Sequence, residues 1–576
     1  MHSDKLKKVI DTAMGRRRAD IVLKGGSIVD VYSGKVIRGD VAICGDTIAG
    51  IGKYKGEEEI DVSGKYLSPG LVDSHIHIES SYLTPEEFAR IIVPCGTTTV
   101  ISDPHEIVNV CGTEGLRYMI KASKNAALKV KFMVPSCVPA TPFENAGAVV
   151  TSKDIEKIFE EEDVLGLGEF MNAVGVINND DECINKIVTA INDGRVIDGH
   201  SPGLTGNQLN AYASAHIEND HECMTVEEME ERIMRGMYVI MREGSACHDL
   251  KTLIKGLTPE NSRRCLLCSD DRQIRTIFEE GHINAHLRFC VSCGISPVDA
   301  VRMASLNASE CFGLRDIGGI APGRSADIVV FDSLTGFRPE QVFIDGRLVA
   351  RDGEYLLPIE RYDISGVSSS VNVRDFSVDR LKLKLKDGNV RTIEIDPNGV
   401  NTGEGRARVA LTGDKDFRYS EAQDIVKVAV VERHKGTGNV AVGLLSGYGI
   451  KNGAAAISVA HDSHNIIAAG TSDEDIAAAV QEIIRMKGGM TLVRGGKPAY
   501  SIPLPVAGLM TDLDAESFDR ELKRIHELAY SDFKINKDID PFMTLCFMAL
   551  PVIPDLKITD KGLFDVRKFE FTDINI

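Results

Sequence analysis

The chain has 576 residues, of which 43% are hydrophobic, and a formal net charge of −19 at pH 7. A chain of this length is too long to fold around a single hydrophobic core, so we expect two to four domains. The acidic balance disfavours non-specific binding to nucleic acids or anionic membranes. The charged first twenty residues and the lack of a long apolar run predict neither a signal peptide nor a membrane span. Thirteen cysteines, an odd number, indicate reduced thiols of a cytoplasmic protein rather than a disulfide framework.

The N-terminal region is expected to form a small β domain that is split in the sequence. After a charged helix, short apolar runs alternate with Gly and Asp turns from Ala19 to about Lys65. The same pattern returns from Ser325 to Leu356. Segments 19–22 and 326–329 both read ADIV, which predicts two paired strands of one domain. We therefore predict a composite β-sandwich domain made of residues 1–66 and 320–362.

Between these halves lies a strand–helix alternation that predicts a (β/α)8 barrel over residues 67–319. Helical patterns such as 85–93 and 154–161 separate most of the strands. An open, doubly wound sheet is the rival arrangement. The eight predicted strands are 71–77, 98–103, 130–134, 164–170, 196–200, 216–221, 238–243 and 265–270.

The most informative stretch is Ser68–Ser81, SPGLVDSHIHIESS, with His75 and His77 at its centre. Residues two apart in a strand point to the same face, so the two imidazoles should lie side by side, with Val72 and Ile76 turned elsewhere. Two neutral imidazoles on one face suit a borderline divalent metal ion. Such a pair can also merely cap a buried strand end, but the apolar strand before it and the polar exit after it favour a metal.

Metal-ligand side chains recur at the predicted carboxyl ends of the other strands, where chemistry gathers in such barrels. Any one of these groups alone would be read as a solvated loop, but together they place four histidines and two carboxylates on one face. That set is enough for two metal ions with Glu169 as the bridge and one bound hydroxide as the nucleophile. The predicted metal ligands are His75, His77, Glu169, His200, His221 and Asp270.

Several segments are individually distinctive, among them SDPHEI, GLGEFMN, GHSPGL, CSDDR and EEGHINAHLR in the barrel, and RHKGTGN and AISVAHDSHNI after it. With SPGLVDSHIHIESS they resemble the amidohydrolase superfamily, and within it the bacterial and archaeal adenine deaminases, over nearly the whole chain. Many superfamily members bridge two metals with a carboxylated lysine, whereas Glu169 stands at that place here, as in adenine deaminases. The resemblance implies hydrolysis of adenine to hypoxanthine and ammonia in purine salvage, with two Mn²⁺ or Fe²⁺ ions per chain.

The residues suit that chemistry, in which hydroxide attacks C6 of adenine and charge develops on the ring. Asp270 can accept the proton of the nucleophile and deliver it to the leaving amine. A second proton donor should face the ring nitrogen, although His105 could instead orient a ligand and His282 could be an ordinary helix residue. The candidates for this donor are Glu79, His105, Glu106 and His282, and those for substrate contact are Glu106, Arg242 and Ser245.

Two other metal-binding patterns occur in the chain. The CLLC of 265–268 and the CVSC of 290–293 have the spacing of a structural zinc ribbon. The first pair falls in an apolar strand and the second in a helix, so we expect no shared zinc ion. The HIE of 77–79 matches half of the signature of mononuclear zinc deaminases, but the PC at 94–95 lacks the second cysteine, which disfavours that class.

Residues 366–576 are predicted to form a C-terminal α+β domain of the adenine-deaminase type. Its predicted strands include 424–432, 455–460 and 490–493, and its helices are 473–486 and 516–530. Polar groups gather in the RHKG of 433–436 and the HDSHN of 461–465. These segments are either ordinary turns or part of a cover that excludes water from the barrel mouth.

We therefore expect a homo-oligomeric cytoplasmic enzyme that acts on adenine and has no nucleic-acid or membrane partner. Hydrolysis of a cyclic amide, as in dihydroorotases and hydantoinases, is the alternative function. A binding or scaffold protein would not need six ligand-type residues at strand ends.

Overall fold

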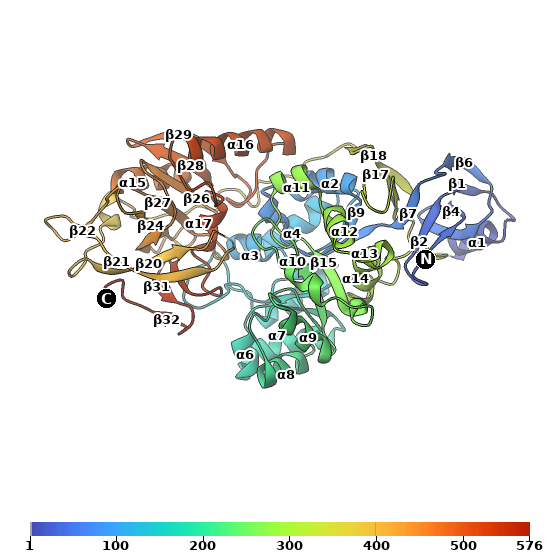
Figure 1. Ribbon diagram of the computed structural model, residues 1–576, viewed down its shortest axis with the longest axis horizontal. Coiled ribbons are helices and arrows are strands. Elements are labelled where there is room, and N and C mark those ends of the chain that lie inside the picture. The colour runs from blue at the N-terminus through green and yellow to red at the C-terminus, as the bar shows by residue number, and fades with distance from the viewer. Residues whose placement is uncertain (1–2, 398) are drawn as a thin grey trace.

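The computed structural model describes residues 3–397 and 399–576. Three parts follow one another along the long axis, with the N-terminus beside the small β domain and the C-terminus at the opposite end (Figure 1). The barrel lies between the small β domain and the C-terminal domain. Within the described residues, no helix is long and apolar enough to cross a membrane.

Eight parallel strands form the predicted barrel, which the structure confirms. One sheet has the order β12-β11-β10-β9-β8 and the other the order β13-β14-β15. Strands β12 and β13 lie beside each other, and a parallel bridge between Ile76 and Asp270 joins β8 to β15. The strands are β8 (Leu71–Ile76), β9 (Thr97–Ser102), β10 (Lys129–Val134), β11 (Gly166–Phe170), β12 (Val196–Gly199), β13 (Asn219–Asp220), β14 (Tyr238–Arg242) and β15 (Cys265–Cys268).

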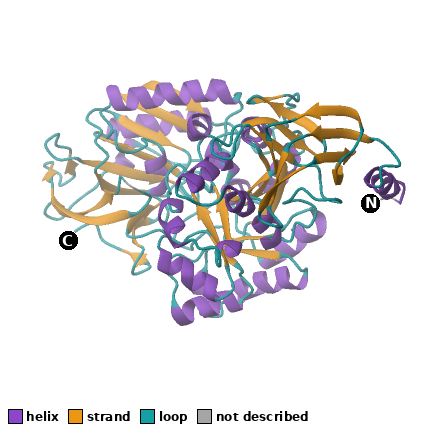
Figure 2. Cartoon of the chain, turned by 45° about the vertical axis from the view of Figure 1, so that its right-hand side comes forward, coloured by secondary structure: helices purple, strands orange, loops and turns teal. Residues whose placement is uncertain are grey.

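Helices surround the barrel strands (Figure 2). Local sequence starts several of them: Thr151 and Asp154 exchange hydrogen bonds in a capping box at the beginning of α5. Because both faces of the strands are buried, the strands read as nearly continuous apolar runs. The helices are α2 (Pro85–Ile92), α3 (His105–Cys111), α4 (Thr113–Ser123), α5 (Ser152–Glu161), α6 (Ala173–Ile177), α7 (Asp181–Asn192), α8 (Gly206–Ser214), α9 (Val226–Met234), α10 (Leu250–Leu253), α11 (Ile274–Glu280), α12 (Ile283–Ser292), α13 (Pro297–Met303) and α14 (Leu306–Cys311).

The first barrel strand departs from strict alternation. Val72 packs in the core inside the barrel with Met133 and Leu266, whereas Ile76 packs in the outer layer against the helices. The expectation that Val72 turns away from the two histidines was therefore wrong. The pairing of β8 with β9 is irregular between Asp73 and Ile76, and the extra residue resets the alternation before the histidines.

The small β domain consists of two sheets, ordered β5-β4-β1-β6 and β19-β18-β17-β16-β7-β2-β3. The second sheet joins both halves of the domain, because β7 pairs antiparallel with β16, and the barrel is inserted between them. The strands are β1 (Ala19–Lys24), β2 (Ser27–Asp30), β3 (Lys35–Arg38), β4 (Asp40–Cys44), β5 (Thr47–Gly52), β6 (Gly56–Asp61), β7 (Tyr66–Pro69), β16 (Ile328–Phe331), β17 (Pro339–Ile344), β18 (Arg347–Arg351) and β19 (Glu354–Tyr355), and α1 (Ser3–Ala13) precedes them.

The expected pairing of segments 19–22 and 326–329 was wrong, since β1 and β16 belong to different sheets. Their apolar side chains, such as Leu23 and Ile328, nevertheless share one core between the sheets. A common pattern thus indicates a common buried environment and does not fix which strands are neighbours.

The C-terminal domain is built on an eight-stranded sheet of order β21-β20-β25-β24-β27-β26-β28-β29. Helix α15 packs on β26, β27 and β28. The helices are α15 (Asp473–Met486), α16 (Ala515–Ser531) and α17 (Met543–Phe547). The sheet strands are β20 (Asn389–Ile395), β21 (Thr402–Arg408), β24 (Ile425–Val431), β25 (Val440–Ser446), β26 (Ala454–Ile457), β27 (Ile466–Gly470), β28 (Gly489–Arg494) and β29 (Lys497–Pro503), and the smaller pieces are β22 (Ala410–Leu411), β23 (Phe417–Arg418), β30 (Leu556–Thr559), β31 (Gly562–Asp565) and β32 (Glu570–Phe571).

Polar contacts fasten the C-terminal domain to the barrel. The amide of Thr511 donates to the carbonyl of Tyr82 over 2.8 Å. Asp560 accepts from the backbone amide of Asn145 at 2.9 Å and from its side chain at 2.6 Å. These contacts place the C-terminal domain on loops that follow β8 and β10.

Candidate active site

His75 and His77, at the end of β8, turn their Nε2 atoms toward each other at 3.2 Å. Their Nδ1 atoms lie 2.8 Å from Asp198 Oδ2 and from the carbonyl oxygen of Asp103, respectively. A carbonyl oxygen only accepts, so Nδ1 of His77 carries a proton and Nε2 of neutral His77 carries a lone pair. The contact with Asp198 fixes the ring of His75 in the same way. Two facing lone pairs repel, and a cation that both nitrogens can coordinate fits between them.

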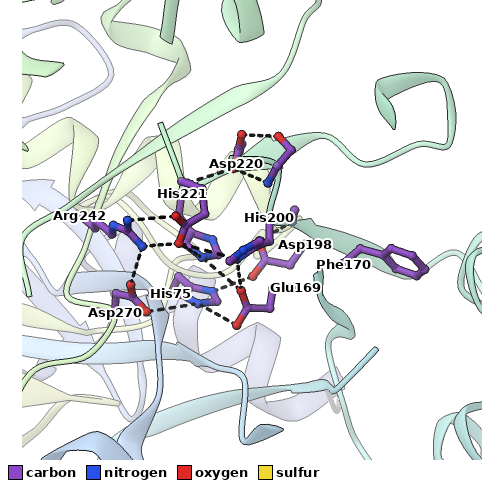
Figure 3. A network of polar contacts seen from close by, with 12 residues as sticks. His75, Glu169, Phe170, Asp198, His200, Asp220, His221, Arg242 and Asp270 are labelled. Carbon is purple, nitrogen blue, oxygen red and sulfur yellow. Dashed lines mark hydrogen bonds and ion pairs between the residues drawn. The ribbon is translucent and has the colours of Figure 1, made fainter. Parts of the chain in front are cut away.

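Glu169, in β11, lies between two pairs of histidines, and Figure 3 shows it beside His75, His200 and His221. Its Oε1 is 3.9 Å from Nε2 of His75 and 3.4 Å from Nε2 of His77. Its Oε2 is 2.7 Å from Nδ1 of His200 and 3.3 Å from Nε2 of His221. One carboxylate oxygen thus faces each pair, which is the arrangement expected of a carboxylate shared by two ions.

Asp270 follows β15 and completes the set of six predicted ligands. Its Oδ1 is 3.2 Å from Nε2 of His77, and its Oδ2 accepts from Arg242 at 3.1 Å. Arg242 is itself buried and also bonds Glu222 and Asp249 (Figure 3 shows Arg242 beside Asp270). The guanidinium therefore fixes which oxygen of Asp270 faces the histidines.

The donor set fits divalent metal ions, and the site is of a metal-dependent kind. Several groups of three ligand atoms lie within 4.8 Å of one another: His75 with His77 and Asp270, His75 with Glu169 and His221, His77 with His105 and Glu169, and His200 with His221 and Glu222 are among them. Burial and the charge of His105 act to lower the pKa of His77, but Asp270 and Glu169 outweigh them and raise it well above its ordinary value. The carboxylates thus attract positive charge to this point. Cys247 also lines the pocket, and burial raises the pKa of its thiol.

Two other candidates, His105 and Glu106, lie at the start of α3 and line the same pocket. His105 Nδ1 is 3.0 Å from Oε1 of Glu169. Arg242, a candidate for substrate contact, lines this pocket as well. The structure therefore brings these three residues together with the predicted metal ligands.

Three candidates lie elsewhere. His282 is buried on the helix side of β8, with Nε2 at 3.2 Å from Asp73 and its ring against Phe88, so it is not positioned to donate a proton in the pocket. Glu79 accepts from an amide of α3, and burial raises its pKa to about 7, but it does not line the pocket. Ser245 bonds the hydroxyl of Thr276 at 2.7 Å and lines a neighbouring cavity.

The pocket has a second wall that comes from the C-terminal domain. Its apolar part includes Val400, Phe547 and Leu550, and its polar part is His461 and Asp462. The HDSHN segment is therefore part of the site and not a distant turn. Of the two alternatives for this polar cluster, an ordinary turn or part of a cover over the barrel mouth, the structure favours the cover.

A buried lysine holds the apolar wall in place. The Nζ atom of Lys557 in β30 donates to the carbonyl oxygens of Val400 at 2.9 Å and Phe547 at 3.0 Å. Burial lowers the pKa of this amine from 10.5 to about 7. A neutral amine has two N–H groups, which match the two carbonyl acceptors.

Residues 66–349 match the Amidohydrolase family, and residues 400–570 match the Adenine deaminase C-terminal domain. Adenine deaminase 2 of Desulfotalea psychrophila is 54% identical over 574 residues, which cover 100% of both chains. The chain belongs to the adenine deaminase family. The adenine deaminases of Nitratidesulfovibrio vulgaris strain DP4 and Ligilactobacillus salivarius are 48% and 49% identical to it and align over 99% of each chain. The resemblance of the sequence to adenine deaminases is thereby confirmed over the full chain, including the second wall of the pocket.

Proposed function

We propose that this member of the adenine deaminase family hydrolyses adenine to hypoxanthine and ammonia, a reaction of purine salvage. The observation that carries the proposal is the full-length similarity to an adenine deaminase, 54% identical, in a chain whose ligand-type side chains converge on one pocket. Cyclic amide hydrolysis is not favoured, because the family match includes the C-terminal domain that forms one wall of that pocket.

We propose two divalent ions per chain, Mn²⁺ or Fe²⁺, as the resident metals. Imidazole and carboxylate donors without thiolate suit such ions. When bound, the ions supply an activated water as the nucleophile near neutral pH. The proposed ligands are His75, His77, Glu169, His200, His221 and Asp270.

Asp270 is the proposed proton shuttle. Its Oδ1 faces the histidine pair, while Arg242 occupies its Oδ2. The carboxylate takes the proton that the attacking water loses as the bond to C6 of adenine forms. It then gives that proton to the exocyclic amine, which leaves as ammonia when the C6–N bond breaks.

The proposed proton donor to the purine ring is His105, because both oxygens of the other pocket candidate, Glu106, bond His461 and His464 of the C-terminal domain. His105 and Glu106 line the pocket, whereas Glu79 and His282 do not. His105 lies between Glu169 and the polar wall of the C-terminal domain, with Nε2 at 3.8 Å from Asp462 Oδ1. A proton carried on that ring is therefore close to both sides of the pocket.

The test is the conversion of adenine to hypoxanthine by wild type and Asp270→Asn, with metal analysis of the same samples. The Asn side chain keeps a ligating oxygen but takes no proton near neutral pH, so kcat should fall by about 10²–10⁴-fold. Metal content should fall less, because five other ligands remain. Asp249→Asn removes another carboxylate that bonds Arg242 but does not line the pocket, and it should keep most of the activity.

Near-normal turnover by Asp270→Asn would remove Asp270 from the shuttle role. Hydrolysis of a cyclic amide by the metal-loaded wild type, without ammonia release from adenine, would refute the proposed reaction.

A further inference from the structure

The 461–465 loop lies between strands β26 and β27 of the C-terminal domain. It reaches the barrel pocket. It bonds Glu106 of the barrel across the domain boundary: Nδ1 of His461 lies 2.7 Å from Oε1, and Nε2 of His464 bonds Oε2. This contact joins the two domains through residues that lie 355 positions apart in the sequence. The loop is therefore part of the substrate pocket.

Both oxygens of Glu106 are already used in this contact. Nδ1 of His464 accepts from the amide of Ala460 at 3.2 Å, so the ring proton of neutral His464 is on Nε2 and is donated to Glu106. Burial acts to lower the pKa of His461, but Glu106 outweighs it and raises that pKa to about 9. Glu106 is thus held between one neutral and one charged imidazole, with both oxygens engaged.

Asp462 is the carboxylate of the 461–465 loop that can still accept a hydrogen bond from a ligand. It is buried, lines the pocket, and its Oδ2 has no hydrogen-bond partner within residues 3–397 and 399–576. Its Oδ1 is 3.8 Å from Nε2 of His105, which is longer than a hydrogen bond. A buried acceptor without a donor is costly, so this oxygen calls for an N–H or O–H group from a ligand.

The 461–465 loop is held firmly enough to position such an acceptor. Buried Arg433 donates from Nε to the carbonyl of His464 and from Nη2 to the carbonyl of Ser458 at 3.2 Å. Asn465 donates to the carbonyl of Asn145 in the barrel at 2.8 Å. Asp462 is therefore fixed against both domains before any substrate arrives, which lowers the entropic cost of binding.

The shape of this wall suits a flat heteroaromatic ring. The imidazole of His461 stacks on Phe547, with ring centroids 4.6 Å apart and planes 21° apart. Val400 and Leu550 continue the apolar surface beside them. Free adenine has flat apolar faces and carries one N–H group on its ring, at N9 or N7. Adenine substituted at N9, as in a nucleoside, has lost the N9 hydrogen and, in its neutral form, has no ring N–H.

We propose that Asp462 accepts a hydrogen bond from the ring N–H of the free base and so selects free adenine over N9-substituted adenines. This inference rests on the proposed function. It assigns to the C-terminal domain a specificity-determining residue, in addition to the exclusion of water from the barrel.

The experiment compares wild type, Asp462→Ala and Asp462→Asn in the metal-loaded full chain. KM and kcat are measured with adenine, and 9-methyladenine, which lacks a ring N–H, is tested as a competitive inhibitor. A hydrogen bond to a charged acceptor that exists in both ground and transition states changes KM rather than kcat. The KM for adenine should rise about ten- to hundredfold in Asp462→Ala, with kcat within a few-fold of wild type. The inhibition constant of 9-methyladenine should stay within about twofold, and Asp462→Asn, which keeps an acceptor oxygen, should recover part of the loss.

Asp475→Ala serves as the matched control, because it removes another buried carboxylate of the C-terminal domain that does not line the pocket. It should leave KM unchanged. A KM of Asp462→Ala within about threefold of wild type would overturn the inference, and so would equal losses for adenine and 9-methyladenine, which indicate a structural role. Failure of wild type to release ammonia from adenine would instead refute the proposed function and is a separate result.

Discussion

Lys557 makes the stability of the C-terminal domain depend on pH in a direction that can be calculated. Burial holds the pKa of the folded amine at about 7, whereas the ordinary value is 10.5. Between these values the unfolded chain binds one more proton than the folded chain. The free energy of unfolding therefore rises with pH across this window. Replacing Lys557 by Met preserves most of the side-chain length and removes the titrating group.

Linkage with these two pKa values makes the wild type about 2 kcal/mol more stable at pH 9 than at pH 7 through this group alone. The Met variant lacks that gain. The difference in stability between wild type and variant should therefore move by about 2 kcal/mol in favour of wild type over these two pH units. For an unfolding unit of roughly 200 residues this corresponds to about 4–8 °C in Tm.

The assay is thermal unfolding of metal-loaded wild type and Lys557→Met, measured by calorimetry at pH 7, 8 and 9. Because each comparison is made at one pH, all other titrating groups cancel between the two proteins. Parallel pH profiles of the two proteins would refute the reasoning. That result would mean that the buried amine stays charged at neutral pH, despite its two carbonyl partners.

The remaining predictions concern the barrel. Asp198→Asn weakens the acceptor that fixes Nδ1 of His75, so metal affinity, measured by competition with a chelator, should fall about 10–100-fold; unchanged affinity would contradict the ligand assignment. Arg242→Met leaves buried carboxylates without their cation and should lower stability by about 3–5 kcal/mol in thermal unfolding; a smaller loss would mean that other charges compensate. Replacing Cys290 and Cys293 by Ser should leave metal content unchanged, since Cys293 is exposed and Cys290 lies in the apolar core; loss of one zinc ion per chain would show a zinc ribbon.

The sequence predicted the barrel well because most of its strands contain short apolar runs followed by polar side chains. The eight predicted strands correspond to β8–β15, and the six predicted ligands meet at one face since parallel strands bring their carboxyl ends together. His282 illustrates the limit of that rule. It stands in a distinctive motif, yet it packs behind β8 against Asp73, because a motif shows that a residue matters and not which side of a strand it occupies.

The contribution of the C-terminal domain to the site could not be derived from the sequence. Asp462 and Phe547 reach the pocket only through docking between domains, and the chain between them and the ligands has no periodicity that reports such docking. The irregularity after Asp73 was also hidden, because a single extra residue in a strand leaves the apolar pattern almost unchanged.

The split β domain has a consequence for synthesis on the ribosome. Strand β7 ends at Pro69, and its partner β16 begins at Ile328. Roughly 260 residues separate the two strands, so at typical translation rates the open edge of β7 waits about 10–50 s for its neighbour. An unpaired apolar edge is a template for wrong association during that interval. Pairing of β7 with β2 covers only the opposite edge, so the edge that β16 later pairs stays open until the second half of the domain emerges.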